Sequence, residues 1–236
     1  TEMHHSDSAI VTTVDTLAKL LDVCGELRAS EQVDERAVTG CSFDSRAVSA
    51  GDVFFCKGAA FKPAFLRMAL DAGAVAFVCE ESLVESLEPL AQESGAAMLV
   101  VDSVRTAMAL LPPEVYDRPD RDVKIVGITG TKGKTTAAFM LQSIIKAAGE
   151  SCGMIGSVST DDGIECYEST NTTPEAPEVW RHIANCRTSG RQSMVMEVSS
   201  QALKYQRVEN LPFDVACFLN IGRDPVSYTH LRAHET

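Results

Sequence analysis

The chain alternates short apolar runs with longer stretches in which apolar side chains recur at helical spacing. Runs rich in β-branched and aromatic residues are typical of buried strands, and the first half has three, at residues 54–56, 75–78 and 98–101. Between them we expect helices at residues 63–72 and 82–93, with Ser82 and Glu85 at capping-box spacing. This order predicts an α/β fold with mainly parallel strands.

A break in the pattern suggests two domains. A helix that begins near Ser103 runs into Pro112 and Pro113, and a stretch rich in proline and charge follows at residues 116–122. Proline and charge discourage regular structure there. We therefore place the boundary near residue 120, which gives a first domain at residues 1–119 and a second at 120–224.

The second half opens with an apolar run at residues 123–128, which predicts a buried strand. A glycine-rich turn leads from it into a helix expected over residues 135–148, with Gly149 as its C-cap. Further strands are expected at residues 193–197 and 215–219, with one helix between them and another around residues 175–186. Residues 225–236 do not continue this pattern, and we expect them to be a non-native tail. His230 and His234 in that tail are four residues apart, but no third metal ligand is evident.

Composition narrows the classes of partner. With 236 residues and 45% hydrophobic content, the chain can bury sizeable cores. Its 33 acidic against 21 basic residues give a net charge of -12, which disfavours nucleic acid as a partner. An anionic nucleotide such as ATP remains compatible, because a helix N-terminus and a few cations set the local field.

The eight cysteines are widely spaced and include no C-x-x-C pair, so we expect reduced core thiols rather than disulfides. No apolar stretch approaches the roughly 18 residues of a membrane span, and no signal peptide is evident. We therefore expect a cytoplasmic protein without a membrane partner.

The segment Gly-Thr-Lys-Gly-Lys-Thr-Thr lies between the expected strand and helix and has the features of a phosphate-binding loop. Its glycines allow a tight turn that brings backbone N–H groups onto phosphates, and the helix adds its positive dipole end. Lys134 can neutralise β/γ-phosphate oxygens, and the Thr135 hydroxyl can ligate magnesium. Ile128 replaces the first glycine of the strict motif, so the loop is a variant. The expected nucleotide-binding residues are Gly130, Thr131, Lys132, Gly133, Lys134, Thr135 and Thr136.

This variant loop resembles the ATP loop of the Mur ligase family, MurE type, and four further segments resemble that family in the same order. They are residues 43–46 with 51–55, residues 171–174, residues 197–200 with Leu203 and Arg207, and residues 219–224. The resemblance covers most of residues 38–224. It implies an N-terminal α/β domain that binds a uridine nucleotide, followed by a truncated P-loop central domain with a mainly parallel sheet.

The resemblance implies an ATP-dependent ligase of peptidoglycan precursor synthesis. Such an enzyme phosphorylates a substrate carboxylate and lets an amino group attack the acyl phosphate. Here a diamino acid would be added to UDP-N-acetylmuramoyl-L-alanyl-D-glutamate, with Lys134 and Glu197 as catalytic residues. Magnesium would be held by Thr135 and Glu197. A carboxylate at the end of an apolar strand is costly unless it faces a cation, and the position of Glu197 agrees with this role.

The resemblance also implies substrate contacts in two places. Ser45 would contact the uridine diphosphate, with Phe43 nearby. The muramoyl peptide would be held by Asn171, Thr172, Thr173, Ser199 and Arg207. Taken singly, these residues also fit a polar turn, a capped loop and a surface ion pair.

Several positions depart from the family pattern. Lys132 replaces a common asparagine, Gln201 a histidine, Tyr205 a glutamine in some members, and Pro225 a histidine that helps to hold a second magnesium. The carbamylated lysine and the C-terminal domain that binds the incoming amino acid have no counterpart. We therefore expect this chain to be inactive by itself, and the choice between lysine and meso-diaminopimelate stays open.

Two other hypotheses remain at this point. One is another Mur-like ligase, of the folylpolyglutamate or cyanophycin synthetase type, against which the Asp-Ser-Arg segment at residues 44–46 argues. The other is a non-catalytic nucleotide-binding module that changes conformation without forming a bond. For the leading hypothesis, a ligase of the MurE type, we expect a monomer.

Overall fold

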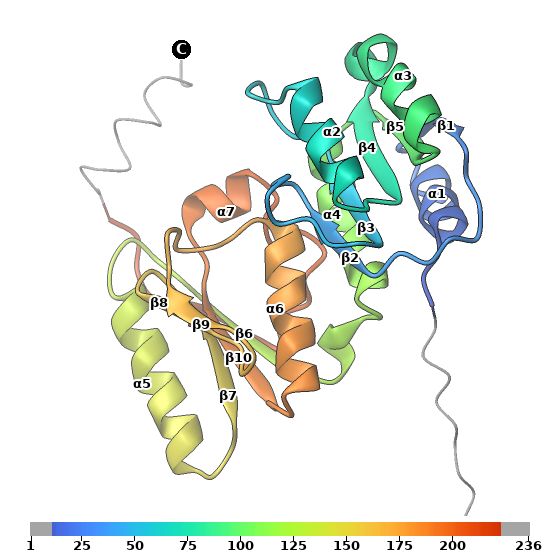
Figure 1. The fold of residues 1–236 in the computed structure, drawn as a ribbon. Coiled ribbons are helices and arrows are strands. Elements are labelled where there is room, and N and C mark those ends of the chain that lie inside the picture. The colour runs from blue at the N-terminus through green and yellow to red at the C-terminus, as the bar shows by residue number, and fades with distance from the viewer. Residues whose placement is uncertain (1–10, 223–236) are drawn as a thin grey trace, which may run out of the picture. The chain divides into compact units, whose positions relative to one another are not determined.

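The computed structural model describes residues 11–222, which form two compact units with one sheet each (Figure 1). The first unit runs up to Arg118 and the second begins at Pro119. Helix α6 (Ala176–Thr188) contributes residues 176–181 to the first unit and the rest to the second. Each unit is described by itself below.

The first unit has a five-stranded sheet of order β1-β5-β4-β3-β2, in which only β1 is antiparallel to its neighbour. Its elements, in chain order, are α1 (Val14–Val23), β1 (Leu27–Glu31), β2 (Gly40–Ser42), β3 (Asp52–Phe55), α2 (Pro63–Asp71), β4 (Ala76–Glu80), the 3₁₀ turn η1 (Glu81–Leu83), α3 (Val84–Ser94), β5 (Ala97–Val101) and α4 (Val104–Val115).

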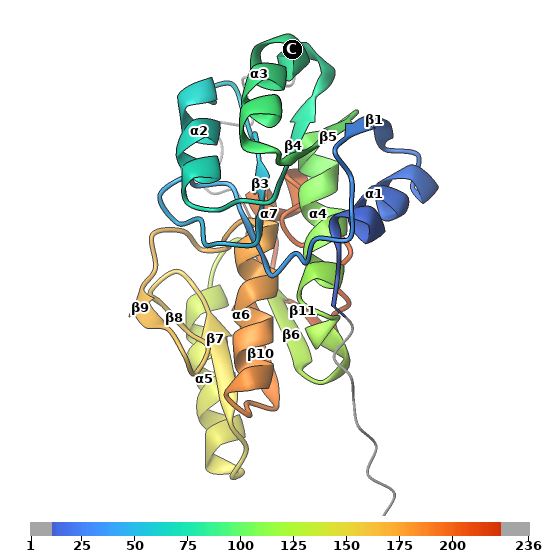
Figure 2. The ribbon, with the colours of Figure 1, turned by 45° about the vertical axis from the view of Figure 1, so that its right-hand side comes forward.

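Helices cover both faces of this sheet. Successive strand residues point to opposite faces, so Val53 and Phe55 pack with α1 and α4, whereas Phe54 packs with α2 and α3. Figure 2 shows the two helix pairs on either side of β3, β4 and β5. Burial on both faces explains why these strands are continuous apolar runs in the sequence.

The three strands predicted in the first half and the helix α2 are confirmed, and the mainly parallel pairing is confirmed. The capping box at Ser82 is wrong, because the chain leaves β4 through η1 and α3 begins at Val84 without a side-chain cap. Helix α4 continues through Pro112 and Pro113, which are buried, and ends at Val115. The elements α1, β1 and β2 were not predicted.

The second unit has a six-stranded sheet of order β11-β6-β10-β7-β8-β9. The first four strands are parallel, and β8 and β9 add an antiparallel edge. Besides α6, its elements are η2 (Pro119–Arg121), β6 (Lys124–Thr129), α5 (Lys134–Ala147), β7 (Cys152–Ile155), β8 (Ser159–Asp161), β9 (Cys166–Glu168), β10 (Ser193–Glu197), α7 (Ser200–Lys204) and β11 (Val215–Phe218). Strands β7, β8 and β9 were not predicted.

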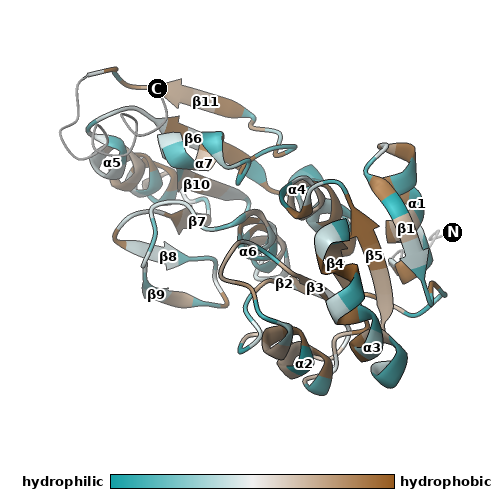
Figure 3. Cartoon of the chain, turned by 90° about the horizontal axis from the view of Figure 1, so that it is seen from above, coloured by the Kyte–Doolittle hydropathy of each residue, from teal (hydrophilic) through white to brown (hydrophobic). Residues whose placement is uncertain are grey.

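The two faces of the second sheet are covered by different helices. Ala138 of α5 packs with Ile128, Met154 and Val195 on one face. On the other face, Cys186 of α6 lies so close to β7 that a Cβ at Gly153 would be 2.5 Å from its sulfur. Figure 3 shows α5 and α6 on opposite sides of β7 and β10. Because the strands β11, β6, β10 and β7 are parallel, their carboxyl ends lie at one edge of the sheet, where the loops that follow them meet.

All eight cysteines are unbonded thiols. Five are buried, but Cys24 and Cys166 are exposed, so the expectation of core positions is wrong for these two. Among residues 11–222, no helix combines the length and the apolar character that a membrane crossing requires. The predicted tail, with His230 and His234, lies outside the described residues.

Candidate functional site

The glycine-rich turn joins the end of β6 to the start of α5. Gly130 and Gly133 have φ values of 144° and 85°, which side-chain-bearing residues rarely adopt. Gly133 is the N-cap of α5 and offers no side chain to bond the first N–H groups of the helix. The positive end of this helix is therefore open to an anion.

Asn220, two residues after β11, fixes the conformation of this loop. Its carbonyl oxygen accepts from the Thr131 N–H at 3.1 Å, and its side chain bonds both the N–H and the carbonyl of Lys132, at 3.1 and 3.0 Å. A Cβ at Gly130 would lie 3.1 Å from the Asn220 carbonyl oxygen. The loop is thus held in place by the strand next to β6, and the N–H groups of Thr131 and Lys132 already have partners.

Lys134 is the first residue of α5, and its ammonium group folds back over the loop. Its Nζ donates to the Gly130 carbonyl at 2.7 Å. A positive charge therefore stands over the turn that the helix dipole also makes positive. Thr136, two residues along the helix, is exposed.

Glu197 ends β10 and is fully buried, with 0% exposure. Its Oε2 accepts from the Thr135 hydroxyl at 2.9 Å and from the Ser157 hydroxyl at 3.2 Å, and its Oε1 accepts from the Ser157 N–H at 2.8 Å. No lysine or arginine within the described residues forms an ion pair with it. A buried carboxylate with only neutral donors is costly unless a cation completes its surroundings.

The donor atoms at this point suit magnesium. Magnesium prefers oxygen ligands and is usually held by one or two carboxylates together with waters and phosphate oxygens. Thr135 and Glu197 supply a hydroxyl and a carboxylate oxygen beside the phosphate-binding turn. The residues present therefore fit that ion.

Three of the residues expected to bind substrate are joined to the Glu197 strand end by hydrogen bonds. The buried Thr173 donates through its hydroxyl to the Glu197 carbonyl at 2.8 Å and accepts from the Ser199 N–H at 3.0 Å. Arg207 donates to the Thr173 carbonyl at 2.9 Å and pairs with Glu175 at 3.1 Å. The structure thus brings Thr173, Ser199 and Arg207 together, although these contacts occupy donors that a substrate would need.

Two other residues of the same loop are more accessible. Asn171 is exposed, and Thr172 is half-buried with its hydroxyl 3.0 Å from the Ser157 hydroxyl. Ser157 was missed in the sequence analysis because it follows β7, a short strand that contains glycine and has no clear pattern. Asn220 belonged to a matching segment, but nothing in the sequence showed that it would hold the loop.

Phe43 and Ser45 lie in the first unit, whereas the other predicted site residues lie in the second. Phe43 packs partly against the core, and the Lys57 ammonium lies 4.7 Å from the centre of its ring. The Ser45 hydroxyl is 3.9 Å from the Met68 sulfur, a weak acceptor. Arg46 beside it pairs with Asp44 at 2.6 Å.

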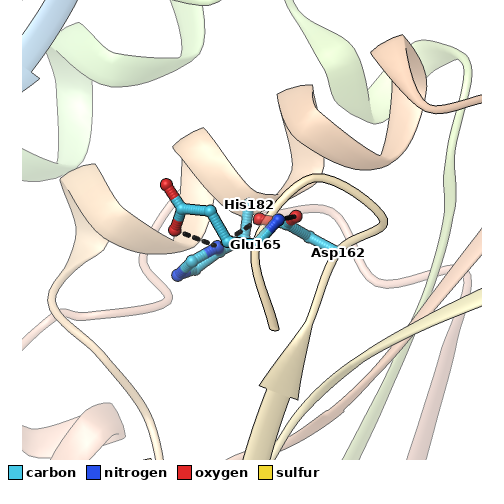
Figure 4. Close-up of side chains that lie close together, drawn as sticks. All are labelled: Asp162, Glu165 and His182. Atoms are coloured by element: carbon cyan, nitrogen blue, oxygen red, sulfur yellow. Dashed lines mark hydrogen bonds and ion pairs between the residues drawn. The ribbon is translucent and has the colours of Figure 1, made fainter. Parts of the chain in front are cut away.

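A second polar cluster lies where the β8–β9 turn meets α6 (Figure 4). His182 and Asp162 are fully buried and 2.6 Å apart, and the second His182 nitrogen is 3.0 Å from the Tyr167 hydroxyl. Asp162 also accepts from the Asn185 amide and from two backbone N–H groups of its own turn.

Burial by itself would raise the pKa of Asp162, but the hydrogen bonds from His182, the Glu165 N–H and Asn185 outweigh it and lower that pKa. Glu165 lies at the edge of the cluster, 4.0 Å from His182. Both oxygens of Asp162 and both nitrogens of His182 have protein partners, so we interpret the cluster as a structural link and not as a metal site.

Comparison with known proteins gives consistent matches. Residues 128–236 match the Mur ligase middle domain. A UDP-N-acetylmuramyl-tripeptide synthetase of Latilactobacillus sakei is 42% identical over 193 residues, which are 80% of this chain and 36% of that protein. A UDP-N-acetylmuramoyl-L-alanyl-D-glutamate--L-lysine ligase of Enterococcus faecalis is 39% identical over 203 residues, which are 85% of this chain and 38% of that protein.

A solved structure shares the fold. It is that of a UDP-N-acetylmuramoyl-L-alanyl-D-glutamate--2,6-diaminopimelate ligase, with a TM-score of 0.71 at 19% identity, covering 95% of this chain and 43% of that chain. The chain therefore spans less than half the length of these relatives.

Proposed function

Since the chain belongs to the Mur ligase family, we propose that it is part of an ATP-dependent ligase that forms an amide bond in peptidoglycan precursor synthesis. The proposed substrate is UDP-N-acetylmuramoyl-L-alanyl-D-glutamate, to which the enzyme adds a diamino acid. The contact between Thr135 and Glu197 carries this proposal, because it places a buried carboxylate beside the phosphate-binding turn.

The residues of the turn have distinct proposed roles. The N-terminus of α5 and Lys134 bind the ATP phosphates, and Thr135 and Glu197 hold magnesium. Magnesium, when bound, offsets the charge that develops on the transferring phosphoryl group. The Lys134 ammonium group offsets the same charge from the side of the loop. Asn220 holds the loop through the Lys132 N–H and carbonyl, so the phosphates are proposed to meet the N-terminus of α5 and Lys134, and not the N–H groups that Asn220 occupies.

The muramoyl peptide is proposed to bind at the loop of residues 171–174. Thr173 ties this loop to the Glu197 strand end, so a substrate held by Asn171, Thr172, Ser199 or Arg207 lies near the phosphoryl group. Proximity of the two reactants supplies part of the rate enhancement. In the first unit, Ser45 and Phe43 are proposed to contact the uridine nucleotide.

The remaining assignments follow from this function. Residues 1–119 are proposed to bind the uridine-nucleotide substrate and residues 120–224 to bind ATP and magnesium. We propose a cytoplasmic monomer that binds neither nucleic acid nor membrane. One relative has a name that specifies L-lysine, and the solved structure has one that specifies 2,6-diaminopimelate, so we propose one of these two as the diamino acid that is added.

A chimera tests the ligase assignment. Residues 11–222 would replace the corresponding part of the L. sakei relative, and the product from ATP, magnesium, UDP-N-acetylmuramoyl-L-alanyl-D-glutamate and lysine or diaminopimelate would be detected by mass. We expect a UDP-muramoyl tripeptide from this chimera and none when it carries Glu197→Gln. A folded chimera that binds ATP without forming an amide would favour a nucleotide-binding module instead.

A further inference from the structure

We propose that the bend formed by Gly156 and Ser157 positions the Glu197 carboxylate, so that Oε2 faces Thr135 and is available to a divalent cation. This inference rests on the proposed function, since it concerns the same magnesium site. Gly156 and Ser157 are positioning residues in this proposal, because they act through Glu197.

The sheet places this bend beside Glu197. Strand β7 runs parallel to β10, and Ile155 at its end pairs with Met196, the residue before Glu197. Gly156 and Ser157 therefore leave the sheet at the level of the carboxylate. Parallel pairing fixes this neighbourhood through backbone hydrogen bonds, so it does not depend on the loops that follow.

The two oxygens of Glu197 are held differently. The backbone N–H of Ser157 donates to Oε1 at 2.8 Å, which fixes the rotation of the carboxylate. Oε2 then points toward the Thr135 hydroxyl, 2.9 Å away. A backbone donor cannot swing away as a side chain can, so the N–H group is a permanent constraint on the carboxylate.

The Ser157 hydroxyl can donate its hydrogen bond to either of two oxygens. It lies 3.2 Å from Glu197 Oε2 and 3.0 Å from the Thr172 hydroxyl, but it has only one proton to donate. When a cation takes up Oε2, the Ser157 proton can turn to Thr172 at no loss of a hydrogen bond. Ser157 thereby links the cation site to the loop proposed to hold the substrate.

Gly156 provides the space that the carboxylate occupies. A Cβ at this position would lie 2.6 Å from Glu197 Oε1, much closer than carbon and oxygen approach without a bond. The backbone of Gly156 is not in the left-handed region, so another residue could adopt its conformation. The need for glycine is therefore steric, and a methyl group there would displace the carboxylate while leaving the fold intact.

A binding measurement on the 236-residue chain tests whether the bend positions the Glu197 carboxylate for a cation or only gives a buried carboxylate a hydrogen-bond partner. Calorimetry would give the Kd of ATP with saturating MgCl2 and with EDTA, and the ratio of the two measures the gain due to magnesium. For Gly156→Ala we expect this gain to fall about tenfold, as is usual when outer-shell partners of a metal ligand are changed. The Kd in EDTA should stay within about twofold, because the loop and Lys134 are untouched.

Two further variants complete the test. Val158→Ala alters an exposed side chain in the same bend and should leave the magnesium gain unchanged. In a Glu197→Asp background the shorter carboxylate no longer meets the added methyl group, so Gly156→Ala should have no further effect there. A further loss of the magnesium gain on adding Gly156→Ala to Glu197→Asp would show that Gly156 does not act through the Glu197 carboxylate, and it would overturn the positioning role.

The outcomes of the two proposals are distinguishable. A wild-type chain that gains nothing from magnesium would contradict the magnesium site itself. A wild-type chain that does gain, with the same gain in Gly156→Ala, would overturn the positioning role and leave the site standing. Equal weakening with MgCl2 and with EDTA would also overturn it, because the effect would then be on the whole domain.

Discussion

The Thr135 hydroxyl lies 2.9 Å from Glu197 Oε2, although 62 positions separate these residues in the chain. Thr135 is in the first turn of α5, and Glu197 is the last residue of β10. Strand β6 connects the two, because it leads into α5 and pairs in parallel with β10. The parallel sheet therefore creates the site by bringing two strand ends to one edge.

Replacing Glu197 by glutamine should remove most of the effect of magnesium on ATP binding. The amide keeps the size of the side chain but loses the negative charge that a divalent cation needs. We expect the magnesium gain, measured by calorimetry with MgCl2 and with EDTA, to fall about tenfold or more. Glu150→Gln, at an exposed position after α5, is the matched control and should behave as wild type. An unchanged gain in Glu197→Gln would exclude this residue as the cation ligand.

Replacing Asp162 by asparagine should destabilise the second unit. The amide would place donors against the donors of Asn185 and His182, in a fully buried cluster. Loss of one partner in such a cluster costs roughly 2–4 kcal/mol in the free energy of unfolding. Denaturant unfolding of Asp162→Asn and of Asp71→Asn, an exposed control, measures the difference at pH 7.

The stabilisation by Asp162 should also depend on pH. The folded pKa of Asp162 is lowered, because hydrogen bonds from His182, the Glu165 N–H and Asn185 outweigh the effect of burial. Its contribution is therefore fully present above the unfolded value of about 3.9 and is lost as pH falls from there toward the folded pKa. The gap in stability between wild type and Asp162→Asn should shrink below about pH 4. A gap that stays constant down to pH 3 would contradict this explanation.

Ser45 should contribute to binding of the uridine nucleotide by the first unit. Among residues 11–222 its hydroxyl hydrogen-bonds only to the Met68 sulfur, a weak acceptor, so a stronger acceptor such as a phosphate oxygen can replace that contact. Titration of the chain with UDP-N-acetylmuramoyl dipeptide should shift the amide resonances of residues 43–46. Ser45→Ala should weaken binding by about fivefold, the equivalent of one hydrogen bond, whereas Ser30→Ala on β1 should not. Shifts confined to residues far from 43–46 would contradict the assignment.

The sequence predicted those features whose signal is local. The turn before α5 was evident because its glycines, Lys134 and Thr135 lie within six residues. Glu197 was implied by the family resemblance of its segment, and its place at the end of an apolar run agreed with that. Ser157 and Asn220 were not evident, because each acts on a residue 40 or 88 positions away and their roles depend on the strand order.

The short antiparallel edge was missed for a related reason. Strands β8 and β9 have three residues each, too few to show an alternating pattern. The link between Asp162 and His182 was missed with them, since it depends on where the β8–β9 turn meets α6. Local capping also failed at Ser82, where a 3₁₀ turn precedes the helix.

The affinity of the chain for ATP with and without the Lys134 ammonium tests the central claim most directly. Lys134 stands over the turn at the positive end of α5, with its Nζ 2.7 Å from the Gly130 carbonyl, and we propose that it is the main cation for the β/γ-phosphates. Calorimetry in MgCl2 should show Lys134→Ala binding ATP at least about tenfold more weakly than wild type, which is 1.4 kcal/mol. Lys146→Ala, in the last turn of the same helix, should remain within about twofold of wild type. Equal affinity of wild type and Lys134→Ala would show that this turn is not the ATP site.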